Sequence, residues 1–201
     1  MSIIVLRGFS NSGKDFVGKI LCEKFNYRRF AFADSLKKIV AKDFNCDIKQ
    51  LHTQEGKLQI CHTDSNNRTY RQILIDEGQR LRQIDADIFA NYCCQEIRDV
   101  GEVSEIGAIS NIVITDWRMP NELQILIDTF PKYTITPVHI VRRGQLESPV
   151  DDISEYHLLN RTKDYTIINN MDESIYKEVD TLINLFTPSH IENAHFSNVI
   201  L

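Results

Sequence analysis

The sequence predicts an α/β fold in which a parallel five-stranded sheet lies between two layers of helices. Three observations support this prediction: short apolar segments recur along the chain, amphipathic segments separate them, and a glycine-rich turn follows the first apolar segment. Runs that are apolar throughout are typical of strands buried on both faces of a parallel sheet. Their alternation with helices indicates βαβ units, so we expect ligands beyond the carboxyl ends of the strands.

Each predicted strand is four or five residues long and nearly all apolar. The five strands are Ile3–Leu6, Arg29–Ala33, Ile112–Thr115, Val138–Val141 and Tyr165–Ile168. Helices are predicted wherever apolar residues recur at helical spacing. These segments are Val17–Phe25, Leu36–Phe44, Tyr70–Leu81, Ile88–Ile97, Glu122–Phe130 and Ile175–Phe186.

Several stretches depart from this alternation. Residues 45–68 are polar and mixed, which predicts an insertion, and residues 100–111 are expected to form a plain loop. Residues 142–161 are rich in charge and contain Gly144 and Pro149, which favours a lid. Residues 187–201 are expected to form a loosely held tail. We therefore expect one domain over residues 1–186.

Composition narrows the class of protein. The chain has 201 residues, of which 42% are hydrophobic and 25% charged, as in ordinary globular domains. Its five cysteines form no C-x-x-C pair, and no apolar run approaches the roughly 20 residues of a membrane helix. The formal net charge of −5 argues against a nucleic-acid polymer as partner. We expect a cytoplasmic protein with no membrane partner.

The segment GFSNSGK at residues 8–14 matches the pattern G-x-x-x-x-G-K and stands between a predicted strand and a predicted helix. In that context backbone N–H groups, the helix N-terminus and the lysine ammonium bind the phosphates of a nucleotide. We expect ATP as the ligand. The predicted ATP-binding residues are Gly8, Asn11, Ser12, Gly13, Lys14, Asp15 and Phe16.

Asp15 occupies the position where a serine or threonine hydroxyl usually binds Mg²⁺. A carboxylate can ligate Mg²⁺ directly or through water. Negative charge also suits the first turn of a helix, so a purely structural role stays open. The Ser12 hydroxyl is a further candidate for the metal.

Two more carboxylates are expected at the carboxyl edge of the sheet, because Asp34 and Asp116 follow predicted strands. Asp116 could hold the water shell of Mg²⁺, as a Walker-B acid does, and Asp34 could orient the acceptor. Asp15 and Asp116 are thus the predicted metal ligands. Capping of a helix by Asp34, or of the strand end by Asp116, is the structural alternative.

Basic residues near these carboxylates predict binding of phosphate. Arginine forks hold phosphate bidentately, and arginines in a lid can neutralise charge that develops during phosphoryl transfer. Arg142 and Arg143 open the predicted lid. The predicted acceptor-binding residues are Asp34, Lys37, Arg68, Arg71, Asp116 and Arg118.

Four motifs resemble known kinases. SGKD in place of GK[ST] is similar to two groups of P-loop kinases, the viral-type deoxynucleoside monophosphate kinases and the animal-type phosphomevalonate kinases. FADSLKK and TDWRMPNEL resemble the FADPLK and DVRFPNE patterns of the first group, whereas SGKDFV and VDDISE resemble the second at least as well. The resemblance spans residues 3 to 186 in the same motif order.

The resemblance implies a three-layer P-loop kinase fold with an acceptor region at about residues 45–99 and a lid at about 142–161. It implies a small-molecule substrate, ATP and Mg²⁺, with transfer of the γ-phosphoryl group to a deoxynucleoside monophosphate. The residues implied in catalysis are Lys14, Asp34, Arg118, Arg142 and Arg143. A phosphomevalonate kinase and a non-catalytic nucleotide-binding relative are the alternatives. The resemblance does not decide whether the chain forms a homodimer. For a viral protein, the expected location is the host cytoplasm.

Overall fold

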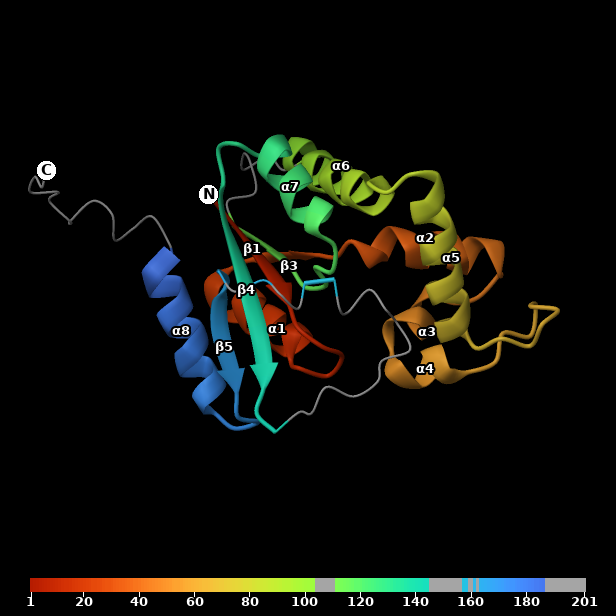
Figure 1. Ribbon diagram of the computed structural model, residues 1–201, viewed down its shortest axis with the longest axis horizontal. Helices are drawn as coiled ribbons and strands as arrows, with labels where there is room; N and C mark the ends of the chain where they lie inside the picture. The colour runs from red at the N-terminus through yellow and green to blue at the C-terminus, as the bar shows by residue number, and fades with distance from the viewer. Residues whose placement is uncertain (104–110, 145–156, 159–160, 162, 187–201) are drawn as a thin grey trace, which may run out of the picture.

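The computed structural model of the chain describes residues 1–103, 111–144, 157, 158, 161 and 163–186. Within them, five parallel strands form one sheet in the order β2-β3-β1-β4-β5 (Figure 1). The strands are β1 (Ser2–Arg7), β2 (Arg28–Phe30), β3 (Asn111–Ile114), β4 (Thr134–Arg142) and β5 (Tyr165–Asn169). The prediction of an α/β fold with a parallel five-stranded sheet flanked by helices is confirmed.

Alternate residues of the central strand β1 face two separate hydrophobic cores. Ile3 and Val5 belong to the core that holds α2 (Ala33–Asp43), α5 (Tyr70–Ile84), α6 (Ile88–Val103) and α7 (Pro120–Thr129). Ile4 and Leu6 belong to the core that holds α1 (Lys14–Phe25) and α8 (Ser174–Phe186). All four side chains are at most 2% exposed. A strand covered on both faces has to be apolar throughout, which is why this segment reads as a continuous run.

β4 is longer than predicted because it begins at Thr134 instead of Val138. The added residues include Pro137, which lacks the N–H that a ladder needs. Pro137 lies opposite Val5 of β1, but β5 begins only opposite Val138. The proline is therefore tolerated in a part of β4 that is paired on one side only.

The predicted insertion contains two short helices, α3 (Ile48–His52) and α4 (Gln54–Leu58). Side chains cap both of them: Asp47 accepts from the Lys49 amide, and Thr53 accepts from the Gly56 amide, each at 2.9 Å. Each helix is too short for apolar periodicity to show. An isolated antiparallel bridge between Ile60 and Thr69 then leads into α5.

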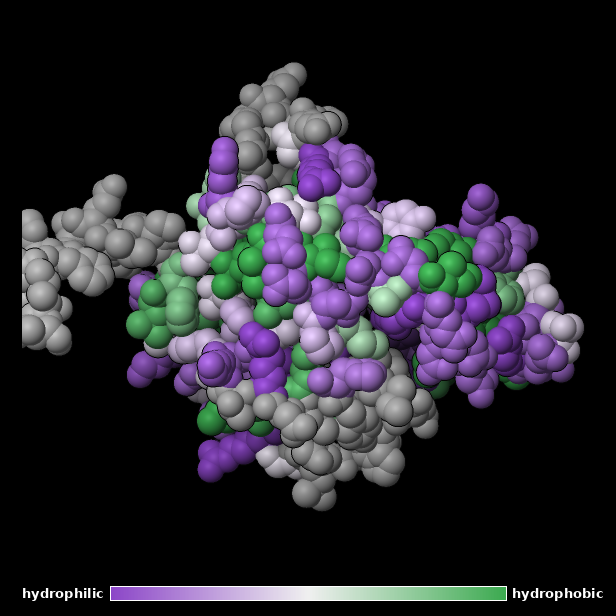
Figure 2. Space-filling model, turned by 45° about the horizontal axis from the view of Figure 1, so that its top comes forward, coloured by the Kyte–Doolittle hydropathy of each residue, from purple (hydrophilic) through white to green (hydrophobic). Residues whose placement is uncertain are grey.

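The insertion lies beside the sheet and not over it. In Figure 1, α2 to α5 extend from the right side of the sheet, and the strands run with their carboxyl ends toward the bottom of the view. The end of the molecule formed by these helices is largely hydrophilic on the face shown in Figure 2.

The loop predicted from residue 100 starts later than expected. α6 continues to Val103, so the prediction was wrong for residues 100–103. A Cβ added at Gly101 would meet no atom of the described chain within 4 Å, so the helix passes this glycine without a close contact that requires it. The predicted tail at 187–201 and the lid residues 145–156, 159, 160 and 162 lie outside the described residues. No helix in the described ranges has the length and apolarity that a membrane crossing needs.

Candidate functional site

The glycine loop lies directly after β1, at the carboxyl edge of the sheet. Gly8 has φ +145° and Gly13 has φ +105°, and a Cβ at either position would lie within 2.4 Å of another atom. At Gly8 that atom is the Ile140 carbonyl oxygen of β4, and at Gly13 it is the Asn169 side-chain nitrogen. Both glycines are therefore required by space as well as by backbone conformation.

Lys14 is the first residue of α1, and Gly13 occupies the N-cap position. Since glycine has no side chain to cap the helix, the first backbone N–H groups and the positive end of the helix dipole are directed at the loop. The Lys14 ammonium donates to the carbonyls of Gly8 and Phe9, at 2.6 and 2.8 Å. The loop thus gathers positive charge around a concave backbone, as an anion site requires.

Ser12 is buried inside the loop. Its amide donates to the Phe9 carbonyl at 3.1 Å, and its hydroxyl has no hydrogen-bond partner within the described part of the chain. Its own carbonyl accepts from the side chain of Asn169, at 2.9 Å. Ser12 is 1% exposed, so the structure does not direct its hydroxyl at the outer surface, where a metal on a bound nucleotide would lie.

Two predicted residues form the rim of the loop. Phe16 is exposed on α1 and contacts the ring of Tyr176 on α8 edge to face, with centroids 5.9 Å apart. Arg142, at the end of β4, donates to the carbonyl of Asn11 at 3.4 Å. Arg143 reaches Asn170 at 3.5 Å instead. Arg142 is therefore the predicted lid arginine that the structure places against the loop.

Asp116 follows β3 and joins two segments of the carboxyl edge. Its two carboxylate oxygens accept from the backbone amides of Phe32 and Ala33, at 2.8 and 2.9 Å. These amides lie at the start of α2, where negative charge is favoured. Each oxygen keeps a second lone pair, so the carboxylate can still accept from a water of a metal shell.

Asp34 lies one residue into α2 and forms ion pairs with two cations. The Arg29 guanidinium donates to one oxygen at 2.6 Å, and the Lys37 ammonium donates to the other at 3.0 Å. Burial by itself would raise the pKa of Asp34, but Lys37 and Arg29 together lower it below its ordinary value. Asp34 is therefore an ionised carboxylate, and it holds Lys37 in position.

The three predicted carboxylates share one neighbour. Burial favours a lower pKa for Arg29, but Asp34, Asp116 and Asp15 act on its guanidinium and raise the pKa above its ordinary value. No group of three or more metal-type side chains is found among the described residues. Asp15 and Asp116 fit a site in which the nucleotide's phosphates and water supply most of the oxygen ligands of Mg²⁺.

Glu122, on α7, holds the backbone that carries Arg118. Its Oε2 atom accepts from the amides of Arg118 and Met119, both at 3.0 Å. Trp117 is buried and donates from its indole nitrogen to the Met119 carbonyl at 2.7 Å. Glu122 therefore braces the backbone at Arg118. Burial raises the pKa of Glu122 to about 7, despite these two backbone bonds.

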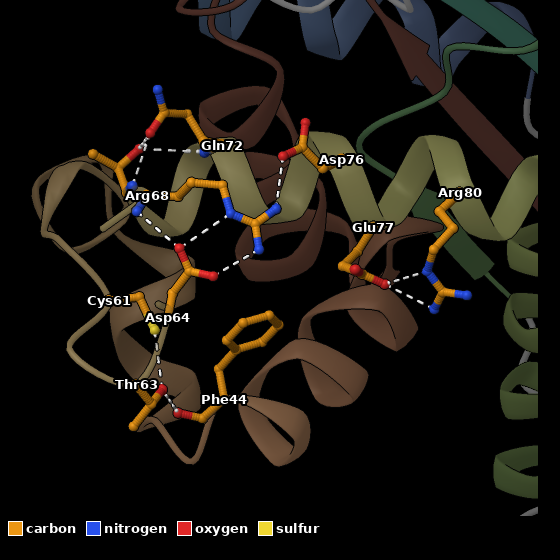
Figure 3. Close-up of polar contacts among 10 residues, drawn as sticks. Phe44, Cys61, Thr63, Asp64, Arg68, Gln72, Asp76, Glu77 and Arg80 are labelled. Carbon is orange, nitrogen blue, oxygen red and sulfur yellow. Dashed lines mark hydrogen bonds and ion pairs between the residues drawn. The ribbon is translucent and has the colours of Figure 1, made fainter. Parts of the chain in front are cut away.

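Arg68 is engaged in ion pairs on the outer side of the insertion (Figure 3). Its guanidinium binds Asp64 through two nitrogens, at 2.7 and 3.1 Å, and Asp76 of α5 at 2.8 Å. Its amide also donates to Asp64, at 2.9 Å. These bonds connect the loop before α5 with the helix, and the structure does not bring Arg68 to the other predicted site residues.

Arg71 faces the short helices of the insertion, unlike Arg68. It donates to Gln54 of α4 at 2.5 Å, while its buried Nε atom has no hydrogen-bond partner within the described part of the chain. Lys57, also on α4, has a pKa lowered by burial and then by Arg71, Lys37 and Arg118, with Asp15 opposing. Three predicted acceptor residues thus lie near one cation that the sequence did not indicate.

His52 is the second residue of this cluster that sequence reasoning did not select as an acceptor contact. Its Nδ1 atom lies 3.4 Å from the Lys37 ammonium. Burial lowers the pKa of His52, and Lys37 lowers it further, so the ring is neutral at pH 7. Lys57 and His52 lie in a polar stretch, where the sequence does not separate a functional side chain from a solvated one. The helices α3 and α4 that position them have no apolar periodicity by which they could be predicted.

A second cluster anchors the end of the predicted lid. Arg7, the last residue of β1, donates to Asp164 at 2.5 Å and to the carbonyls of Leu158 and Arg161 at 3.1 and 2.6 Å. Arg161 also binds Asp164, at 2.6 Å, and lies 5.0 Å from the centre of the Trp117 ring. The chain that returns from the lid is therefore attached to the strand that leads into the glycine loop.

No protein-family model and no curated protein matches the chain. Among solved structures, shikimate kinase from Aquifex aeolicus vf5 is 17% identical with a TM-score of 0.43, covering 90% of this chain and 96% of that one. A gluconokinase from Sinorhizobium meliloti 1021 is 12% identical with a TM-score of 0.40, covering 94% and 98%. The Mycobacterium tuberculosis APS kinase CysC, as a Cys556Ala mutant, is 11% identical with a TM-score of 0.41, covering 92% and 95%.

These three structures are named as kinases. The fold of this chain follows from its own sheet order and glycine loop, which fit the three-layer fold expected of a P-loop kinase.

Proposed function

We propose that the chain is an ATP-dependent phosphotransferase of the nucleoside monophosphate kinase type. It would transfer the γ-phosphoryl group of ATP to a deoxynucleoside monophosphate, giving the diphosphate and ADP. The observation that carries the proposal is the pairing of a phosphate-binding loop with a group of cations: Lys37, Arg71 and Arg118 all act on Lys57, as does Asp15 of the helix that follows the loop. The loop would bind the triphosphate of the donor, and the cations would bind the phosphate of the acceptor. This arrangement fits phosphoryl transfer from one phosphate to another.

The donor side consists of the loop and α1. Lys14 binds two loop carbonyls, and a triphosphate would provide oxygens that replace them for its ammonium. Arg142 lies against the loop at Asn11, where it would neutralise charge on the transferred group. Gly8, Gly13 and the first amides of α1 would hold the β- and γ-phosphates. Phe16 lies on the rim and would border the nucleotide.

The acceptor side consists of α2, α5 and the segment after β3. Asp34 keeps Lys37 in position, and Glu122 keeps the Arg118 backbone in position. In phosphoryl transfer the protein acts mainly by positioning and by stabilising charge. Lys37, Arg71 and Arg118 would therefore orient the acceptor oxygen in line with the γ-phosphorus. Arg68 has no part in this proposal.

Mg²⁺ would neutralise charge on the phosphate oxygens when it is bound. Asp15, exposed in the first turn of α1, and Asp116 would hold it, directly or through water. Asp116 already accepts from two amides, so its position is fixed before any ligand arrives.

Release of ADP from ATP and Mg²⁺, measured with single acceptors, tests the proposal. We expect turnover with at least one deoxynucleoside monophosphate, and a decrease of at least 100-fold in kcat/KM for Lys14→Ala and Arg118→Ala. Lys19→Ala is the matched control, because Lys19 is exposed on the same helix as Lys14.

Three results would contradict the proposal. Turnover of phosphomevalonate, with no deoxynucleoside monophosphate consumed, would replace it with the second candidate, a phosphomevalonate kinase, whose acceptor also carries a phosphate. ATP binding without any acceptor-dependent ADP release would indicate a binding protein. Unchanged activity of folded Lys14→Ala protein would exclude the loop as the donor site.

A further inference from the structure

We propose that Lys57, on the short helix α4, binds the acceptor's phosphate together with Arg71 and makes the site selective for dianionic acceptors. This inference rests on the proposed function and names a binding residue that neither the glycine loop nor the sequence motifs indicate. The class of ligand is a phosphate monoester. Neutral acceptors of otherwise similar shape are excluded.

The first step is the geometry of α4 and α5. Gln54 and Lys57 are three residues apart on α4, so their side chains share one face of the helix. Gln54 accepts from Arg71 of α5 at 2.5 Å, which places that face against Arg71. The ammonium of Lys57 and the guanidinium of Arg71 are therefore neighbours on the side of the insertion toward the sheet.

The second step is that Lys57 and Arg71 lack a carboxylate partner among the described residues. Within the described part of the chain, no carboxylate lies within ion-pair distance of Lys57 or Arg71. The Nε atom of Arg71 is buried and has no hydrogen-bond partner there. Leaving a buried donor of a charged group without an acceptor is unfavourable, because its desolvation is not compensated. An anionic ligand that binds both side chains would supply an acceptor for the Arg71 Nε atom and a counter-charge for Lys57.

The third step is the balance of charge. The carboxylates Asp15, Asp34 and Asp116 act on Arg29, and Asp34 also pairs with Lys37. Arg29 and Lys37 are balanced by these carboxylates, whereas Lys57 and Arg71 have no described carboxylate at ion-pair distance. Their two positive charges match the charge of a phosphate monoester at neutral pH. His52, the remaining titratable group against Lys37, is neutral and adds no charge.

The fourth step is the protonation of Lys57 itself. Burial lowers its pKa, and the three neighbouring cations lower it further. A nearby negative charge favours the ammonium form of a lysine. A bound anion would therefore offset the effect of burial and of the neighbouring cations on Lys57. Bound phosphate would restore the pKa of Lys57 toward its ordinary value.

Binding and kinetics together test the inference. Inorganic phosphate is titrated calorimetrically into protein saturated with Mg²⁺ and ADP, and into Lys14→Ala protein without nucleotide to exclude binding at the loop. We expect Lys57→Gln to weaken phosphate binding about tenfold and to raise the acceptor KM about tenfold. The KM for ATP should change less than twofold. Lys57→Arg should retain most of the affinity.

Lys49→Gln is the matched control, because Lys49 is an exposed lysine on the adjacent helix α3 and is not among the charges that act on Lys57. We expect it to behave as the parent protein. Circular dichroism of each variant shows whether the fold is kept.

Either of two results would overturn the inference: unchanged phosphate binding by Lys57→Gln, or a parent protein that binds no inorganic phosphate when ADP is bound. Equal kcat/KM for a nucleoside and its monophosphate would also overturn it. Failure of the proposed function is distinguishable. In that case Lys57-dependent phosphate binding would be observed without ADP release from any acceptor.

Discussion

The side-chain amide of Asn169, at the end of β5, donates to the carbonyl of Ser12 in the glycine loop at 2.9 Å. The two residues are 157 positions apart in the chain. The Asn169 oxygen also accepts from the amide of Met171, at 2.9 Å, so the side chain is fixed at both ends. The edge strand of the sheet thereby holds the loop that starts at its centre.

Replacing Asn169 is expected to loosen the loop. Asn169→Ala removes both bonds and should destabilise the fold by about 1–3 kcal/mol, because the Ser12 carbonyl and the Met171 amide lose partners. Asn169→Asp keeps the acceptor for Met171 but places negative charge beside the loop. We expect both variants to bind ATP at least tenfold more weakly, measured by calorimetry. Asn170→Ala is the control, and equal weakening by it would contradict a specific role for Asn169.

Alanine substitutions at two glycines, Gly13 and Gly101, should change stability in opposite directions. A Cβ at Gly13 would lie 2.3 Å from the Asn169 nitrogen, in a backbone conformation with φ +105°. Gly13→Ala should therefore cost about 2 kcal/mol or more and abolish ATP binding. A Cβ at Gly101, near the C-terminal end of α6, meets no described atom, so Gly101→Ala should stabilise by about 0.5–1 kcal/mol. Denaturant unfolding followed by the fluorescence of the single, buried Trp117 measures both changes.

Glu122 should make stability depend on pH. Its pKa is about 7 in the folded chain and 4.5 ordinarily, so unfolding releases a proton between these values. The free energy of unfolding is therefore highest below about pH 4.5 and falls as pH rises to about 7, by up to about 3 kcal/mol. Asp116 raises this pKa further, and Arg82 opposes it.

The difference between the parent and Glu122→Gln isolates this contribution. Glutamine keeps an oxygen for the Arg118 and Met119 amides but cannot ionise. The comparison is needed because the pKa of His139 is lowered to about 4 by burial, so protonation of unfolded chains at low pH acts in the opposite direction. We expect Glu122→Gln to gain stability over the parent between pH 5 and pH 8. A constant difference across this range would contradict the prediction.

Arg68 and Arg71 are expected to differ in what they support, although both were predicted to bind the acceptor. Arg68→Ala should lower the midpoint of thermal unfolding by several degrees, because it leaves the buried Asp64 carboxylate without its partner. Its acceptor KM should stay within twofold of the parent. Arg80→Ala, which removes the exposed pair with Glu77 shown in Figure 3, should change little. An acceptor KM raised tenfold in Arg68→Ala would return Arg68 to the site.

The parts of the site that lie on strand ends could be predicted from the sequence. Asp34 and Asp116 follow β2 and β3, and Lys14 follows β1, so the parallel order of strands brings them to one edge. Buried strands leave a continuous apolar run, and the turn that follows each run is then identifiable. The glycine loop could be predicted in the same way, because its backbone conformation requires glycine at fixed positions.

The insertion could not be predicted to the same depth. Arg68 and Arg71 are three residues apart and look equivalent in the sequence, yet one pairs with Asp64 and the other faces Gln54. The difference depends on where α3 and α4 lie. These helices are held by capping and by contacts with each other, of α3 with α2 and of α4 with α5, without apolar periodicity of their own. Lys57 and His52 were not selected for the same reason.

The sequence by itself determined the layered α/β fold, the donor loop and the carboxylates at the sheet edge, because burial and backbone conformation restrict which residues can occupy those positions. Tertiary structure alone decided which cations stay uncompensated and which side chain supports the loop. Those outcomes depend on contacts between segments far apart in the chain, such as Asn169 with Ser12 and Arg7 with Asp164. Charged surface residues are compatible with many local conformations, and only their partners in space determine their roles.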